Sequence, residues 1–140
     1  MREKRGLYRR RGDLKGEMGR WAESRYTARM TEAAIRDFHA HIYFNPEEVA
    51  LAQQLAAAAY ARFGVPVGHF HLKPVGPHPR GSCQLTVPTS QFGDVAQWLA
   101  LNRGSLTIFA HAETGDDLAD HSRHVIWFGP SEPLDLWIFA

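Results

Sequence analysis

Three segments that alternate apolar and polar residues constrain most strongly how this chain can fold. They are DFHAHIYF (37–44), SCQLTV (82–87) and SLTIFAH (105–111). Successive side chains of a β-strand point to opposite faces of a sheet, so each segment presents one apolar face and one polar face. GHFHLKP (68–74) and a short segment, HVIWFG (124–129), are predicted as two further strands. The pattern therefore predicts a sheet with one apolar side.

Two helices are expected between these strands. The first runs through VALAQQLAAAAYARF, with Asn45 as N-cap, Pro46 at the first helical position and Gly64 as a left-handed C-cap. The second runs through QFGDVAQWLALNR and ends at Gly104. The resulting order is β-α-β-β-α-β with an extra short strand, which is typical of ferredoxin-like α+β folds. Both helices are expected to cover one face of an antiparallel sheet.

The opposite, polar face of the sheet collects five of the eight histidines. The apolar face is predicted to hold Phe38, Ala40, Ile42, Phe44, Phe70, Leu72, Cys83, Leu85, Val87, Leu106, Ile108 and Ala110. The polar face is predicted to hold His39, His41, Tyr43, His69, His71, Lys73, Ser82, Gln84, Thr86, Thr107, Phe109 and His111. Since the helices leave this face open, we expect it to meet water, a partner subunit or a substrate.

Histidines at i and i+2 of a strand have Cα atoms about 7 Å apart, so their rings can converge on one metal ion. In a ferredoxin-like sheet the strand 105–111 lies antiparallel beside 37–44, and we expect His111 near His39 and His41. The strand 82–87 is expected to separate His69 and His71 from His39 and His41. The two pairs would then lie two strand spacings, about 10 Å, apart. His69 and His71 are therefore less suited to be ligands. The alternative is that all five are ordinary polar residues of a wet strand face.

The loop HAETGDDLADHSRH (111–124) mixes histidines with acidic residues. It can supply metal ligands or a general base, because imidazole titrates near neutral pH and a carboxylate can complete a histidine ligand set. The candidates are Glu113, Asp116, Asp117, Asp120, His121 and His124. The alternative is an acidic loop in which Asp116 or Asp117 caps a helical turn, and we expect His124 to point elsewhere. His78 in GPHP is either incidental to a turn or held rigidly at the rim of a site.

The charge of the chain is unevenly distributed. Residues 1–29 hold ten Lys/Arg and four Asp/Glu, which gives a net charge of +6. The remaining residues hold six Lys/Arg and eleven Asp/Glu, which gives a net charge of −5. We interpret residues 1–36 as a flexible basic tail and residues 37–140 as the folded domain. The tail is expected to be a solvated appendage; alternatives are an arm for nucleic acid and translation that begins at Met30.

Cysteine content and hydropathy indicate where the protein works. Cys83 is the single cysteine, so an internal disulfide is excluded and a reducing cytoplasm is the expected compartment. No apolar run approaches the roughly 18 residues of a membrane span. We therefore expect neither a membrane partner nor a nucleic-acid partner.

Several motifs, in order, resemble one known family. DFHAHIYF, FHLKPVGPHP, LALNRGSLTIFAH with TGDDLADH, and HVIWFG resemble the DOPA 4,5-dioxygenase family of aromatic ring-cleaving dioxygenases. The resemblance covers about Asp37 to Leu136 and leaves out the basic tail. It implies a ferredoxin-like homodimer that cleaves a catechol ring. By motif position it points to His39, His41, His71, His78, His111 and His121.

The resemblance implies an extradiol dioxygenase that uses dioxygen and non-haem iron(II), with zinc as a substitute in purified protein. The expected metal ligands are His39, His41, His111 and His121. His71 or His78 would handle protons, and Lys73 or Arg80 would pair with a substrate carboxylate. In the expected topology His78 and His111 lie at opposite ends of the sheet. A partner subunit then brings them together, or one of them lies outside the site.

Two other classes of function fit the same residues. A non-catalytic ferredoxin-like dimer that binds a metal or small ligand would keep the ligands but consume no oxygen with catechols. Another open-faced ferredoxin-like enzyme, such as a cofactor-free monooxygenase or a two-histidine phosphoesterase, is the second alternative. The phosphoesterase normally needs His-x-Thr or His-x-Ser pairs, and both HAH and HFH lack them.

Overall fold

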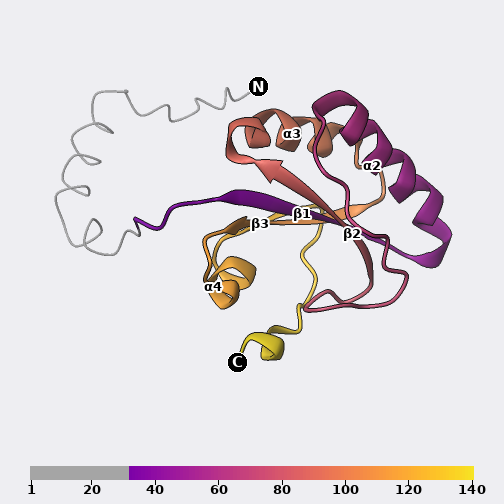
Figure 1. Cartoon of the computed structure of the whole chain (residues 1–140). Helices are drawn as coiled ribbons and strands as arrows, with labels where there is room; N and C mark the ends of the chain where they lie inside the picture. The colour runs from indigo at the N-terminus through magenta and orange to yellow at the C-terminus, as the bar shows by residue number, and fades with distance from the viewer. Residues whose placement is uncertain (1–31) are drawn as a thin grey trace, which may run out of the picture. The chain divides into compact units, whose positions relative to one another are not determined.

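The computed structural model describes residues 32–140, of which Ala34–Ala140 form one compact unit (Figure 1). Residues 1–31 of the predicted basic tail lie outside the described residues. The role of the tail therefore stays a prediction.

Residues 32–140 contain a sheet of four antiparallel strands in the order β2-β1-β3-β4. The strands are β1 (Asp37–Phe44), β2 (Gly81–Pro88), β3 (Thr107–Glu113) and β4 (Val125–Phe128). In the central strand β1, His39 lies opposite Thr86 of β2 and His111 of β3. The α+β class and the predicted adjacency of segments 37–44 and 105–111 are thus confirmed.

The strand predicted over residues 68–74 is wrong. Within the described residues, this segment makes one isolated bridge to β2, from His71 to Ser82, and the preceding Val67 makes a second one to Leu85. Pro66, two residues before the segment, and Pro74, its last residue, have no N–H to donate to a ladder. After His71 the chain leaves the sheet edge and Leu72, which was predicted on the apolar face, is 67% exposed.

The two long helices are those that the sequence predicts. A 3₁₀ turn, η2 (Pro46–Glu48), leads into α2 (Val49–Phe63), and α3 (Thr89–Asn102) follows β2 directly. The Glu48 carboxylate accepts a hydrogen bond from the Asn45 N–H at 3.0 Å, which fixes the start of the first helix. Gly64 ends it at φ 70°, and its N–H donates to the Tyr60 carbonyl. Both helices lie on the same face of the sheet (Figure 1).

The main core lies between these helices and the apolar face of the sheet. Alanines of α2 allow the helix to lie close to the strands. The buried residues include Ala40, Ile42, Phe44, Ala52, Leu55, Ala56, Ala59, Cys83, Leu85, Val87, Val95, Leu99, Leu106, Ile108 and Ala110. Burying one of the large aliphatic side chains stabilises a fold by about 1.5–3 kcal/mol. Apart from Leu72, the predicted apolar face packs against or lies within this core.

The second face of the sheet is partly covered by the same chain, which corrects the expectation of an open face. The short helix α4 (Asp117–Ser122) and the C-terminal 3₁₀ turn η3 (Leu136–Phe139) lie on this side (Figure 1). The Asp116 carboxylate caps α4 by accepting from the Ala119 N–H at 3.0 Å. As a result, several ring side chains of this face are buried, namely His41, Tyr43, Phe109 and His111.

Membrane insertion through a helix finds no support in the described part of the chain. None of its helices combines the length and the apolar character needed to span a bilayer.

Candidate metal centre

Three histidines of β1 and β3 converge on the covered face. Each of His39, His41 and His111 offers a nitrogen, and these nitrogens all lie within 4.8 Å of one another. The antiparallel register places His39 directly opposite His111. The Nε2 atoms of His41 and His111 are 3.1 Å apart. We call these three residues the histidine cluster. The pairing of β1 with β3, which the sequence predicts, brings the three side chains together.

The protonation state of the cluster suits a metal ion. Burial lowers the pKa of His41 well below its usual value, with further lowering by the neighbouring imidazoles, and burial lowers the pKa of His111 to about 4. Both rings are therefore uncharged at neutral pH. Two nitrogens bound side by side at about 2.1 Å from one ion lie about 3.0 Å apart at a right angle and about 3.4 Å apart at a tetrahedral angle, and the 3.1 Å between the Nε2 atoms falls in this range. A set of imidazoles is suited to iron, zinc or copper.

Hydrogen bonds orient the ring of His111. Its Nδ1 lies 3.0 Å from the Ala112 carbonyl oxygen, which can only accept, so Nδ1 carries the proton. The Nε2 lone pair then faces His41 and is available to a metal. The Glu113 carboxylate lies 3.5 Å from Nδ1 of His39 and 3.6 Å from Nδ1 of His111. It can orient both rings in the way that carboxylates support histidine ligands.

Two other members of the acidic loop hold the loop together. Asp120 is fully buried and accepts from the N–H and the hydroxyl of Thr114, each at 2.7 Å, and from His124 Nδ1 at 2.8 Å. Burial alone would raise the pKa of Asp120, but these hydrogen bonds outweigh burial and lower it. Asp116 caps α4. Asp116, Asp120 and His124 therefore have the structural role that the alternative of a capped acidic loop assigns to this segment.

The helix α4 brings His121 to the edge of the histidine cluster. The centre of its ring is 4.1 Å from that of His111 and 4.5 Å from that of Phe139. Nδ1 of His121 is 2.7 Å from the Asp117 carbonyl oxygen and must donate to it. In the neutral form of the ring, Nε2 then keeps a lone pair that can serve a metal or a proton.

His78 reaches the same face from the loop between His71 and β2. Its ring is 4.1 Å from that of His41, and Nδ1 lies 2.7 Å from the Tyr43 hydroxyl oxygen. Burial lowers the pKa of His78 to about 4. The expectation that His78 and His111 lie far apart is wrong, because the irregular loop folds back under β1. Both rings lie beside His41 within a single chain.

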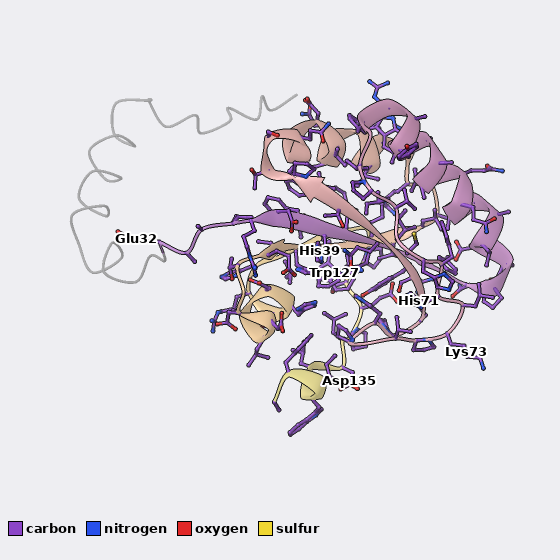
Figure 2. The ribbon with its side chains drawn as sticks, viewed as in Figure 1. Glu32, His39, His71, Lys73, Trp127 and Asp135 are labelled. Atoms are coloured by element: carbon purple, nitrogen blue, oxygen red, sulfur yellow. The ribbon has the colours of Figure 1, made fainter. Side chains whose placement is uncertain are left out.

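Three of the predicted site residues lie elsewhere or have other partners. His71 lies near the β2 edge with its ring 4.8 Å from that of His69, and Lys73 is exposed and points outward (Figure 2). Nε and Nη2 of Arg80 donate to the two carboxylate oxygens of Glu132, each at 2.9 Å. The roles assigned to His71, Lys73 and Arg80 therefore stay predictions.

Aromatic side chains surround the cluster, and the sequence assigned no role to them. Phe109 of β3 lies 5.9 Å from the His41 ring and 4.7 Å from Trp127 of β4. Strand parity did place Tyr43 and Phe109 on this face. Phe139 has no such signal, because it comes from a 3₁₀ turn that follows an irregular segment.

Three comparisons with known proteins agree with one another. Residues 38–138 match the model of the Dopa 4,5-dioxygenase family. The chain is 38% identical over 114 residues to the DOPA 4,5-dioxygenase of Amanita muscaria, a match that covers 75% of this chain and 50% of that protein. It is 33% identical over 111 residues to an uncharacterized 21.2 kDa protein of Botryotinia fuckeliana, which covers 71% of this chain and 61% of that protein.

A solved structure extends the likeness to the fold. The crystal structure of "a putative dioxygenase" from Nostoc punctiforme is similar with a TM-score of 0.73 and 39% identity, covering 74% of this chain and 90% of that chain. The matched part of the Amanita protein is 50% of its length. This chain thus spans about half of that relative.

Proposed function

The chain belongs to the Dopa 4,5-dioxygenase family, and on that premise we propose that it is an extradiol dioxygenase that opens the ring of a catechol such as DOPA. The observation that carries the proposal is the histidine cluster, whose three nitrogens lie within 4.8 Å on a covered face of the sheet. Imidazoles that converge from two paired strands are suited to hold a non-haem iron(II).

The proposed reaction balances without a further reductant. The ring C–C bond beside the diol and the O–O bond of dioxygen break, and both oxygen atoms enter the ring-opened product. The four electrons that reduce dioxygen come from the catechol. Iron(II) held by His39, His41 and His111 would supply neighbouring open positions for the catecholate and dioxygen.

The surrounding side chains have complementary tasks in this proposal. His121 is within reach of the cluster and keeps a lone pair on Nε2, so it can join the ligands or accept a phenolic proton. His78 is favoured over His71 for proton handling, because its ring packs on His41. Trp127 is half-buried and packs on the buried Phe109, so it can offer a flat apolar surface to an aromatic ring, and both side chains limit the access of water.

Substrate anchoring, oligomeric state and location belong to the same proposal. A substrate carboxylate would pair with Arg80 by taking the place of Glu132, or with the exposed Lys73. A homodimer is proposed from the family resemblance. A cytoplasmic location is proposed from the lone Cys83, which is buried and unpaired.

Oxygen uptake by iron-loaded protein tests the proposal. The full chain is reconstituted anaerobically with iron(II), L-DOPA or a simpler catechol is added with oxygen, and oxygen and the ultraviolet-visible spectrum are recorded. We expect iron-dependent uptake and a yellow ring-opened product. His41→Ala should lose both, whereas His69→Ala, which changes an exposed histidine outside the cluster, should keep both.

Iron content is measured for each variant to separate binding from turnover. Folded, iron-loaded wild-type protein that consumes no oxygen with any catechol would overturn the dioxygenase proposal. A non-catalytic metal-binding protein would then be the better description.

A further inference from the structure

The hydrogen bond between Tyr43 and His78 has no role in the function proposed above. Tyr43 is fully buried on β1, two positions beyond His41, and its hydroxyl oxygen lies 2.7 Å from Nδ1 of His78. A phenol is protonated at neutral pH and can either donate or accept a hydrogen bond. The direction of this bond decides which nitrogen of His78 carries a proton.

Burial of the phenol settles the direction. A buried hydroxyl group that donates to nothing loses its hydrogen bond to water without compensation, at a cost of about 1–3 kcal/mol. Among residues 32–140 the Tyr43 hydroxyl has no hydrogen-bond partner other than His78. The hydroxyl must therefore donate to Nδ1, and the proton of the neutral imidazole must be on Nε2.

The other nitrogen of His78 is open to a ligand. Nε2 has no hydrogen-bond partner among the described residues. Every buried side-chain nitrogen and oxygen in this part of the chain does have a partner, so Nε2 is not one of the buried atoms. Nε2 is therefore not sealed inside the protein. It can reach a molecule that enters beside His41, whose ring lies 4.1 Å from the His78 ring.

Both partners of this bond are held in place by their surroundings. The Arg80 guanidinium lies 5.9 Å from the centre of the Tyr43 ring, and Trp127 packs edge-on against the ring at 6.1 Å. Pro77 and Pro79 restrict the backbone on either side of His78, and its N–H donates to the Val75 carbonyl. The phenol and the imidazole therefore meet with little freedom to rearrange.

We propose that Tyr43 is a positioning residue that fixes His78 in the tautomer protonated on Nε2, so that His78 presents a hydrogen-bond donor beside the histidine cluster. The neutral form of His121 is the opposite tautomer, because its Nδ1 donates to the Asp117 carbonyl and leaves a lone pair on Nε2. The catalytic consequence rests on the proposed function. A donor at His78 holds an oxygen atom that gains negative charge, and an acceptor at His121 takes a phenolic proton.

Nitrogen-15 NMR of the histidines tests the tautomer in the metal-free full-length protein. Long-range proton–nitrogen spectra distinguish a protonated from an unprotonated ring nitrogen, and His78→Gln assigns the signals. We expect His78 to be unprotonated at Nδ1 and protonated at Nε2. In Tyr43→Phe the signal should move towards a mixture of tautomers, whereas Tyr60→Phe, which changes an exposed tyrosine of α2, should leave it unchanged.

A His78 that is protonated at Nδ1 in the wild-type protein would overturn the proposal, even if Tyr43→Phe does not fold. A folded Tyr43→Phe variant with the wild-type His78 spectrum would overturn it as well. Because the NMR measurement needs no turnover, its result tests the tautomer of His78 independently of the dioxygenase proposal.

A kinetic measurement on iron-loaded protein tests the catalytic consequence. We expect Tyr43→Phe to lower kcat with L-DOPA by about 10-fold, in the range typical of supporting residues around a metal site. KM should change little, and kcat is calculated per bound iron so that a loss of folded protein does not count. An unchanged kcat in a variant whose His78 tautomer is lost would overturn the catalytic consequence.

Discussion

At the level of single residues, the buried histidines of the candidate site make the free energy of unfolding depend on pH. His41, His78 and His111 are buried beneath the sheet. Burial disfavours the charged form of histidine, and it holds the pKa values of His78 and His111 at about 4. In the unfolded chain the same side chains titrate near their usual value of about 6.5. The unfolded state therefore binds more protons between these two pH values.

The metal-free protein is predicted to lose stability as the pH falls through this window. Above about pH 6.5 the rings are neutral in both states, and below it only the unfolded state gains protons, so the free energy of unfolding decreases until about pH 4. Each tenfold difference in proton affinity contributes about 1.4 kcal/mol. Urea unfolding after chelation, followed by circular dichroism at several pH values, measures the effect.

His78→Gln removes one of the buried imidazoles and should make this pH dependence shallower. The matched variant His69→Gln changes an exposed ring and should keep the wild-type dependence. Equal urea midpoints at pH 7 and pH 5 for the metal-free wild-type protein would contradict the prediction.

At the level of elements, local sequence signals predicted the helices well. The Asn45–Pro46 start and the Gly64 end of the first helix agree with the observed boundaries. These signals act through the backbone of a few neighbouring residues, so no knowledge of tertiary contacts is needed. The alternation of β1 and β3 was equally informative, because both strands are central and one face of each packs on the helices.

Two glycines of the helices are predicted to respond in opposite directions to alanine. Gly64 has φ of +70°, where a Cβ is strained, so Gly64→Ala should destabilise the protein by about 1 kcal/mol. Gly93 lies within α3 and has open space where the Cβ of an alanine would lie, so Gly93→Ala should stabilise the protein by up to about 1 kcal/mol. Thermal unfolding of both variants checks the pair, and a stabilised Gly64→Ala would contradict the assigned cap.

The segment 68–74 shows where local signals were insufficient. Its alternation of histidines and apolar residues resembles a strand, but only His71 of the segment and Val67 just before it pair with β2, each in an isolated bridge. The prolines near its ends carried the contrary signal, since they cannot donate to a ladder. The outcome depended on the tertiary path of the following loop, which no periodicity predicts.

At the level of the whole molecule, the closure of the site could not be predicted. The cover over the second face depends on contacts between irregular segments far apart in sequence, such as the ion pair of Arg80 with Glu132 and the bond from the Asp135 N–H to the Pro77 carbonyl at 2.9 Å. Strand parity and strand adjacency could predict the histidine cluster itself. They could not show that His78 and His121 both approach it within one chain.

The fate of labelled dioxygen tests the proposed activity most directly. Iron(II)-loaded protein is allowed to turn over L-DOPA under ¹⁸O₂, and the product is analysed by mass spectrometry after its aldehyde is trapped by reduction before exchange with water. We predict that the ring-opened product contains both labelled atoms. An unlabelled product, or consumption of oxygen with release of hydrogen peroxide, would contradict ring cleavage by a dioxygenase.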